Sequence, residues 1–407
     1  MPSHGAGGRG REVDEGAART ASNVAAVEEK KVLGNHLENY FHLANKKALY
    51  YNLKSYYDSV GEDVFQVLPL TFHIKEGVGD PEFQRFQEFY AQRELESSES
   101  PASKKRKRNI WIVKPGENTN RGCGITVCKD LAAVKEVIST PLRTLSDGRK
   151  RSYIVQRYLD RPLLFFRRKF DIRAWTLLTA INGNLQGYWY RDGYIRTCSR
   201  EFSLKNTQNK FIHLTNDAIQ KRSEDYGRFE NGNKLSYAEF QKYLDQHMPD
   251  LKCNFVEQIV PQMKKIAMDS IKCVYNKIDP NKRQHSFEVF GYDFMIDEDL
   301  KVWLLEVNTN PCLELSSPYL SRLIPTMLEN ALKIAVDPLF PPPAWPQSKR
   351  HLIPDVTENK FELVFNEATD AGELRHLPFA NEKNIDIIEE EEVEDEVGSE
   401  NEEEDYL

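Results

Sequence analysis

The residues with the clearest chemical potential lie at the end of one apolar stretch, KVWLLEVNTNP, residues 301–311. Its first half has the composition of a buried β-strand, but Glu306 and Asn308 follow at a spacing of two. Side chains two positions apart on a strand point to the same face. We therefore predict that a carboxylate and a carboxamide face one site from the end of this strand.

A second carboxylate is expected from the preceding strand, FEVFGYDFMI, residues 287–296. A tight hairpin across the turn DEDL would put Asp293 opposite Leu304. Asp293 would then share a face with Glu306 and Asn308, one step along the diagonal. Two carboxylates and one carboxamide, without His or Cys nearby in the sequence, suit a hard cation such as Mg²⁺. The alternative is that the carboxylates form internal ion pairs with core arginines.

Phosphate groups often complete such a metal site, and the stretch WIVKPGENTNRGCGI offers partners for them. Lys114 ends a predicted buried strand, and Arg121, Gly122 and Gly124 lie in a loop whose backbone amides can approach an anion closely. This loop alone is a weak signal. A Walker P-loop is excluded because GKT and GKS are absent.

A third candidate element is RRKFDIRAW, residues 167–175. Lys169, Asp171 and Arg173 alternate on a predicted strand and therefore project to one face as cation, anion and cation. An exposed edge strand with cross-strand pairs is the alternative, but it would not need the apolar partners on its other face. The pattern favours a phosphate-binding wall, to which Arg196 in a later predicted strand is a possible addition.

A polar segment, FIHLTNDAIQK, leads into a predicted helix and contains His213, Thr215 and Asn216. We interpret His213 as a structural hydrogen-bonding residue, because that role is more frequent than catalysis for a lone histidine. The sequence contains no recognisable Ser/His/Asp or Cys/His set for nucleophilic catalysis.

These candidates must be positioned by a chain of 407 residues, of which 40% are hydrophobic, enough for two or three packed units. Predicted strands alternate with helices from residue 109 to 341, with NGN (182–184) and RDGY (191–194) as hairpin turns. The fold class expected from this pattern is α/β (α+β), rich in antiparallel strands. Because no window holds 18 uninterrupted apolar residues, we expect no membrane span.

The chain is predicted to have six parts, distinguished by composition. They are a disordered lead (1–30), a small N-terminal domain (31–92), a flexible Ser-rich and basic linker (93–108), a catalytic region (109–341), an extension (342–385) and a disordered acidic tail (386–407). A nuclear-import or anion-binding patch is the alternative for the linker. Six cysteines without a CxxC pair favour reduced thiols in the cytosol.

The net charge of −8 is unevenly distributed. Residues 386–407 hold 13 acidic and no basic residues, so residues 1–385 carry a net charge of +5. Such a run is typical of a solvated, disordered tail. The alternative hypothesis is that this tail competes with an acidic substrate for the basic body, or is itself modified.

The motifs WIVKP, RGCGI, IVQRYL, RKFDIRAW, IRTCS, HLTNDAIQK, YGRFENGN, FGYDFMID and VWLLEVNTNPCLE, in this order, closely resemble the tubulin tyrosine ligase-like family, a branch of the ATP-grasp ligases. The resemblance covers residues 31 to 340, approximately. It implies an ATP-grasp fold with a small N-terminal domain and with the nucleotide held between two antiparallel sheets.

Carried over residue by residue, the resemblance implies three groups of site residues. Lys169, Arg173 and Arg196 are implied to be catalytic, with the arginines holding the acyl phosphate and the incoming amino acid. Mg²⁺ would be bound by Asp293, Glu306 and Asn308. ATP would be bound by Lys114, Arg121, Gly122, Gly124, Gln156, Arg157, Tyr158, Leu159, Lys169, Asp171, Thr215 and Asn216, with the backbone of 156–159 meeting adenine.

One residue departs from the family pattern, because Cys123 stands where many members carry a basic residue. This substitution predicts a looser grip on the phosphates.

The function implied by the resemblance is an ATP- and Mg²⁺-dependent ligase that adds a free amino acid to the C-terminal tail of tubulin through an acyl phosphate. The stretch HLTNDAIQKRSEDYGRFENGN leans towards the tyrosine-adding branch. Polyglutamylation or glycylation is the alternative, and a catalytically weak microtubule-binding protein is an alternative of another class. We expect a cytoplasmic monomer associated with the cytoskeleton or cilium, with neither nucleic acid nor membrane as partner.

Overall fold

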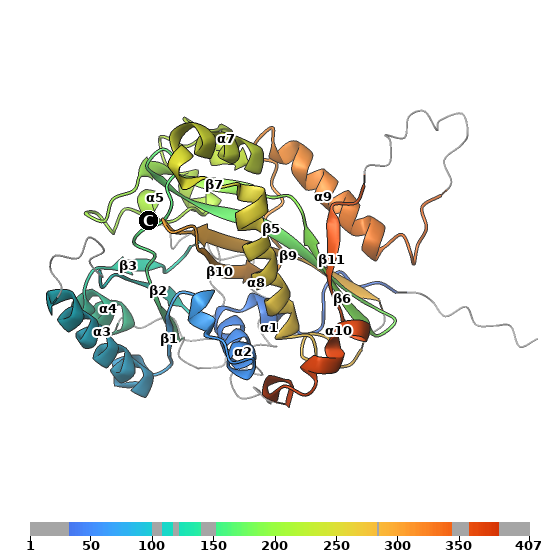
Figure 1. Cartoon of the computed structure of the whole chain (residues 1–407), viewed down its shortest axis with the longest axis horizontal. Helices are drawn as coiled ribbons and strands as arrows, with labels where there is room; N and C mark the ends of the chain where they lie inside the picture. Colours follow the sequence, from blue (N-terminus) through green and yellow to red (C-terminus); the bar gives the residue numbers. More distant parts are fainter. Residues whose placement is uncertain are drawn as a thin grey trace, which may run out of the picture. The chain divides into compact units, whose positions relative to one another are not determined.

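The structure is a computed structural model that describes residues 32–99, 108–116, 122–139, 152–282, 285–343 and 358–381 (Figure 1). The chain divides into two compact units, Met1–Val32 and Leu33–Leu407. Everything below concerns the second unit. The predicted lead, half of the basic linker, Arg121 and the acidic tail lie outside the described residues. The six-part division of the chain stays a prediction.

The smaller sheet has four antiparallel strands in the order β1-β4-β2-β3. The bounds are Thr71–Ile74 (β1), Trp111–Pro115 (β2), Thr126–Cys128 (β3) and Tyr153–Arg157 (β4), and the helices packed on it are α3 (Pro81–Glu99) and α4 (Leu131–Ser139). Alternate strand residues, among them Phe72, Trp111 and Val155, pack with these helices in one core. The other alternate set, which includes Lys114 and Gln156, therefore projects from the opposite face.

The larger sheet has seven strands, in the order β10-β9-β5-β6-β11, with β7 paired to β5 and β8 paired to β7. Every pairing in it is antiparallel, which confirms the expected antiparallel-rich α/β class. The bounds are Arg168–Ile181 (β5), Asn184–Tyr190 (β6), Tyr194–Glu201 (β7), Lys234–Ser236 (β8), Ser286–Ile296 (β9), Val302–Asn308 (β10) and Phe361–Asn366 (β11).

Helices cover both faces of this sheet. On one face α2, α7, α8 and α10 contribute to the largest apolar core, and α8 crosses the sheet in Figure 1. On the other face α9 packs on Trp175 and Leu177, at the C-terminal half of β5. The bounds are Phe41–Ala44 (α1), Lys46–Ser59 (α2), Lys210–His213 (α5), Asp217–Gln220 (α6), Tyr237–His247 (α7), Val260–Lys272 (α8), Leu320–Ala335 (α9) and Glu367–Leu374 (α10).

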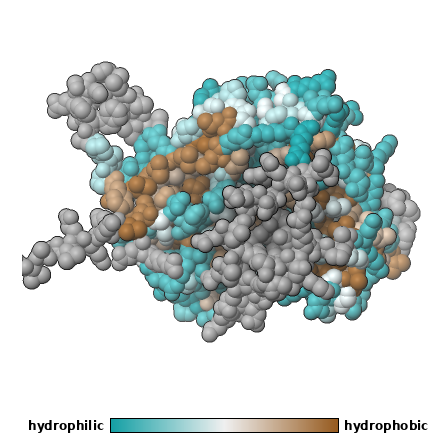
Figure 2. All heavy atoms as spheres, turned by 180° about the vertical axis from the view of Figure 1, so that it is seen from behind, coloured by the Kyte–Doolittle hydropathy of each residue, from teal (hydrophilic) through white to brown (hydrophobic). Residues whose placement is uncertain are grey.

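The face that carries α9 is divided along β5. Trp175 and Leu177 are apolar and lie under α9, whereas Lys169, Asp171 and Arg173 continue the same alternate set toward the strand's start. The helix itself is apolar on more than its buried side, since Leu332 is 46% exposed and an apolar band lies over α9 in Figure 2. The charged half of this face is where the predicted site residues gather.

The two predicted hairpin turns have different outcomes. Asn182 and Gly183 both have positive φ and connect β5 to β6 as a two-residue hairpin, which confirms the turn at NGN. The prediction for RDGY is wrong, because β6 and β7 pair one after the other along the same β5 strand. The 14 residues of β5 are long enough to pair with both. Gly193 is required at the break, since a Cβ there would lie 2.4 Å from the carbonyl oxygen of Arg173.

The predicted register of the β9–β10 hairpin is also wrong by one residue. Leu304 pairs with Phe294, and Asp293 pairs with Glu306, because a β-bulge interrupts the register between Leu304 and Glu306. A bulge places one extra residue in one strand. The consequence is that the two carboxylate-bearing residues are direct cross-strand neighbours rather than diagonal ones.

Candidate functional site

Charged side chains on neighbouring strands form a continuous row across the larger sheet. Arg173 of β5 is the cross-strand partner of Asp293 on β9, and Asp171 of β5 is the partner of Arg196 on β7. Lys234 of β8 is in turn the partner of Arg196. Because cross-strand partners lie on the same face, five charged residues meet without an intervening apolar side chain.

Asp293 is bound by two guanidinium groups. Its carboxylate accepts hydrogen bonds from Nε and Nη2 of Arg173, at 2.6 and 3.2 Å, and Nη2 of Arg196 lies 2.8 Å from its Oδ2. Burial alone would raise the pKa of Asp293, but the two arginines hold it well below its ordinary range. Asp293 is therefore an anion, and the alternative of an internal ion pair with core arginines holds for this residue.

Arg196 joins the two acidic residues of the row. Its Nε and Nη2 donate to Asp171 at 2.7 and 2.5 Å, while Thr215 donates its hydroxyl to Asp171 at 2.5 Å. Burial opposes the charge of Arg196, but Asp171 and Asp293 raise its pKa well above the ordinary value. Arg196 is therefore a fixed cation whose orientation is set by two anions.

Arg173 keeps one donor for a ligand. Its Nη1 is buried and has no hydrogen-bond partner among the described residues. Buried guanidinium donors are normally satisfied, so this nitrogen is a candidate binding group for an anion or a water molecule. The backbone of Gly291 lies against the same guanidinium group, since a Cβ there would come within 3.3 Å of Nη1.

The three residues expected to bind Mg²⁺ lie close together. Nδ2 of Asn308 donates to the carbonyl of Gly291 at 3.3 Å and to Oδ2 of Asp293 at 3.4 Å. Oδ1 of Asp293 accepts only from Arg173 among the described residues, which leaves it a lone pair. No described cluster of three or more His, Cys, Asp and Glu side chains suits a metal. Two carboxylates and a carboxamide nevertheless fit a hard cation that takes its other ligands from water and phosphate.

Lys114 faces this site from the smaller sheet. Its Nζ donates to Oε1 of Gln156 at 3.0 Å, and Nε2 of Gln156 donates to the hydroxyl of Thr71 at 2.9 Å. Burial lowers the pKa of Lys114 to about 8, and the charge of Glu306 opposes that shift. Glu306 on β10 therefore lies close enough to influence Lys114 on β2, although the two residues belong to different sheets.

The predicted adenine-binding segment, residues 156–159, uses part of its backbone within the smaller sheet. The amide of Arg157 donates to the carbonyl of Leu70 at 2.8 Å, and that of Tyr158 donates to Ile110 at 3.0 Å. An adenine ring would therefore have to meet other backbone groups of the segment. Leu159 directly follows and is half-buried.

The glycine loop closes on the start of α6. Gly122 has φ of 79°, and a Cβ there would lie 2.7 Å from Ile219 and 3.3 Å from Oδ1 of Asn216. Gly124, with φ of 67°, approaches Pro115 as closely. The loop thus lies against Asn216, one of the residues that the resemblance implied would bind ATP, and the positive φ favours glycine at both positions.

Two basic residues of this region were missed by the sequence analysis. Lys234 is 6% exposed and donates to Oδ1 of Asp217 at 2.5 Å, beside the row of charges. Lys46, at the start of α2, adds to the lowering of the Lys114 pKa and therefore lies near it. The local sequence does not predict a site role for either lysine, because β8 is only three residues long and Lys46 has the pattern of an ordinary surface residue of a helix.

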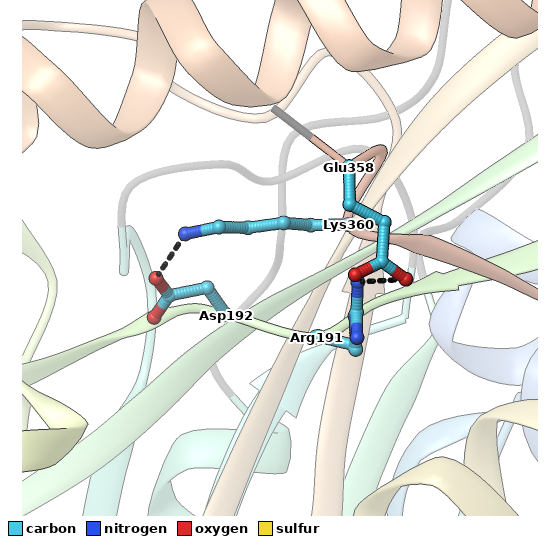
Figure 3. A pocket seen from close by; sticks show the side chains of 4 residues that line it. All are labelled: Arg191, Asp192, Glu358 and Lys360. Carbon is cyan, nitrogen blue, oxygen red and sulfur yellow. Dashed lines mark hydrogen bonds and ion pairs between the residues drawn. The ribbon is translucent and has the colours of Figure 1, made fainter. Parts of the chain in front are cut away.

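A separate hollow of about 430 Å³ lies where β11 meets the break between β6 and β7. Figure 3 shows its four charged residues in two pairs, Arg191 with Glu358 at 3.1 Å and Lys360 with Asp192 at 3.3 Å. Each charge is thus compensated within the hollow. The two ion pairs connect the segment before β11 to the residues between β6 and β7. They leave no net charge in the hollow for a ligand.

Comparison with known proteins identifies the family and the relatives that this chain resembles. The model of the tubulin-tyrosine ligase family matches residues 25–343. Tubulin glycylase 3D of Tetrahymena thermophila is 38% identical over 233 residues, and Tubulin glycylase 3A of Drosophila melanogaster is 37% identical over 234. Human Tubulin monoglycylase TTLL3 is 35% identical over 234 residues.

Each of these matches covers 56% of the present chain but only 21, 22 and 29%, respectively, of the relative. The chain therefore spans less than a third of the length of these relatives. None of the helices in the described ranges is both long and apolar enough to cross a membrane.

Proposed function

This chain belongs to the tubulin-tyrosine ligase family, and on that premise we propose that it is an ATP- and Mg²⁺-dependent ligase that joins glycine to a carboxylate of an acidic protein tail, such as that of tubulin. The family match and the antiparallel sheets confirm the expected ATP-grasp class. Glycine replaces the earlier lean towards tyrosine, which is not supported, because relatives at 35 to 38% identity are named glycylases.

The observation that carries the proposal is the orphaned Nη1 of Arg173 beside the pair formed by Asp293 and Arg196. A ligase of this class transfers the γ-phosphoryl group of ATP to a carboxylate oxygen, which releases ADP. The amine then attacks the carbonyl carbon, phosphate leaves and one proton is lost. Both steps place negative charge on oxygen, and a fixed, buried guanidinium donor stabilises that charge without reorganisation.

The chain's cations are arranged for these two steps. Lys114 and Lys169 would bind phosphate oxygens from the smaller and the larger sheet, and Arg173 would donate Nη1 to the oxygen of the reacting carbonyl. Asp293, Glu306 and Asn308 would hold Mg²⁺, which neutralises phosphate charge when bound. Arg196 would keep Asp293 ionised and oriented toward that ion.

The test uses the purified full chain with ATP, Mg²⁺ and tubulin, and offers labelled Gly, Tyr or Glu in separate reactions. We expect glycine to be incorporated and mass spectrometry to find it on an acidic tail. Incorporation of Tyr or Glu in preference to Gly would overturn the choice of amino acid. If the chain co-sedimented with tubulin but incorporated none of the three amino acids, the alternative of a catalytically weak microtubule-binding protein would be favoured.

A further inference from the structure

Three buried side chains form a chain of hydrogen bonds that ends on Lys169. Nζ of Lys169 donates to the carbonyl of His213 at 2.8 Å and to the hydroxyl of Tyr158 at 3.3 Å. The ammonium also lies 4.7 Å from the centre of the Tyr158 ring. Lys169, Tyr158 and His213 are 5, 3 and 1% exposed, so water does not compete for these bonds.

The direction of each hydrogen bond follows from its last acceptor. Nε2 of His213 lies 2.8 Å from the carbonyl of Asn206, which can only accept, so Nε2 carries a proton. Burial lowers the pKa of His213 to about 4, so the ring is neutral and Nδ1 is an acceptor. The Tyr158 hydroxyl must donate to it at 2.8 Å, which turns the oxygen lone pairs of Tyr158 toward Lys169.

This chain of bonds leaves Lys169 with an unused N–H. Burial lowers the pKa of Lys169 to about 8, so the ammonium form still predominates at neutral pH. An ammonium has three N–H groups, and the partners found among the described residues take two of them. Both partners are neutral, whereas Lys234 in the same region is paired with the Asp217 carboxylate. The nearby Asp171 carboxylate is already engaged by Arg196 and Thr215. Lys169 is thus held in place without being neutralised.

We propose that Tyr158 and His213 are positioning residues that aim the third N–H of Lys169 at a nucleotide phosphate. This inference rests on the proposed function, in which Lys169 binds ATP. A flexible lysine side chain would lose rotamer entropy on binding a phosphate, as long side chains do when they are immobilised. The hydrogen bonds from Lys169 to Tyr158 and His213 order the lysine side chain during folding, so ATP binds to a preorganised cation.

The experiment compares Tyr158→Phe with the wild-type chain in direct binding of ATP and of adenosine. The substitution keeps the ring and removes only the hydroxyl. We expect ATP to bind about tenfold more weakly, as for loss of one charge-assisted hydrogen bond, with adenosine binding unchanged. Tyr57→Phe is the matched control, because it removes another buried hydroxyl, bonded to Asp269 at 2.9 Å, and we expect no change in ATP binding.

Two further variants test whether the effect passes through Lys169. If it does, Tyr158→Phe should have little additional effect on ATP binding in a Lys169→Met background. His213→Asn, whose amide oxygen can replace Nδ1 as acceptor, should retain more ATP affinity than His213→Leu.

The inference is overturned if Tyr158→Phe binds ATP like the wild type, or loses ATP and adenosine affinity equally. If the wild-type chain bound ATP no more tightly than adenosine, the role of Lys169 in binding phosphate would be overturned as well. Absence of amino acid incorporation with normal ATP binding would instead contradict the proposed function and leave the positioning role supported.

Discussion

Two carboxylates on strand β9, Asp293 and Glu288, are equally buried at 2% exposure but differ in every other respect. An odd separation of five places them on opposite faces of the strand. Asp293 meets two arginines, whereas Glu288 accepts hydrogen bonds from the Leu37 amide at 3.0 Å and from the Thr309 hydroxyl. Burial raises the pKa of Glu288 above its ordinary value, and its hydrogen bonds offset that rise only in part.

The difference shows that burial does not by itself set the charge of a carboxyl group. Desolvation raises both pKa values, and only the guanidinium groups reverse the shift at Asp293. Asp293 belongs to the proposed site, whereas Glu288 joins the segment around Leu37 to the residue that follows Asn308. Asp293 is held as an anion by two arginines, whereas Glu288 connects two segments of the chain.

The largest effect is expected from Asp293→Asn. This change leaves two buried guanidinium groups without a carboxylate between them, and breaking a buried ion pair costs about 3–5 kcal/mol. We expect the free energy of unfolding to fall by about that amount and ligation to fall by orders of magnitude. Urea unfolding and amino acid incorporation measure the two effects. A loss of less than about 1 kcal/mol would show that the ion pairs are weak.

Glu306→Gln tests the predicted metal site independently of the ion pairs of Asp293. Glu306 is the cross-strand partner of Asp293, and the substitution removes one charge while nearly preserving volume. We expect ligation at limiting Mg²⁺ to fall by orders of magnitude with the free energy of unfolding unchanged. Glu298→Gln, in the exposed turn of the same hairpin, is the matched control. Wild-type turnover at limiting Mg²⁺ would exclude Glu306 as a ligand.

Glu288→Gln should have a much smaller effect. The amide oxygen can still accept from the Leu37 backbone, whereas the contacts of the other carboxylate oxygen with Thr309 and with Nδ1 of His36 are weakened, at a cost of about 1 kcal/mol per hydrogen bond. Ligation should stay near the wild-type rate. Unfolding in urea measures the change in stability. A loss as large as that of Asp293→Asn would show that the contacts of Glu288 stabilise the fold as strongly as the buried ion pairs do.

The pH dependence of stability should distinguish the two carboxylates by sign. The folded pKa of Glu288 is raised, so the native state binds more protons above its ordinary value of 4.5. Its contribution is present below pH 4.5 and is lost as pH rises through the folded pKa. The folded pKa of Asp293 is lowered, so its contribution is present above its ordinary value of 3.8 and is lost as pH falls.

The measurement is the difference in unfolding free energy between wild type and each variant from pH 4 to pH 7. The advantage of wild type over Glu288→Gln should shrink as pH rises, whereas the advantage over Asp293→Asn should persist to neutral pH. Parallel slopes for the two variants would show that the carboxyl groups share one environment.

Local sequence patterns were sufficient to predict which residues share a face, because alternation is a property of the backbone of a single strand. Lys169, Asp171 and Arg173 were grouped correctly, and so were Glu306 and Asn308. The turn at NGN was also predicted, since Asn and Gly tolerate the positive φ that a two-residue hairpin requires. These features depend on residues that are neighbours in the chain.

Which faces meet, and in what register, depends on contacts between segments that are distant in the chain. The bulge in β10 that places Asp293 opposite Glu306 depends on pairing with β9, and the strand break at Gly193 depends on the length of β5. The hydrogen bond from Tyr158 to His213 joins residues 55 positions apart. Such contacts are set by the packing of distant strands against one another, and no local preference of a segment encodes its partner.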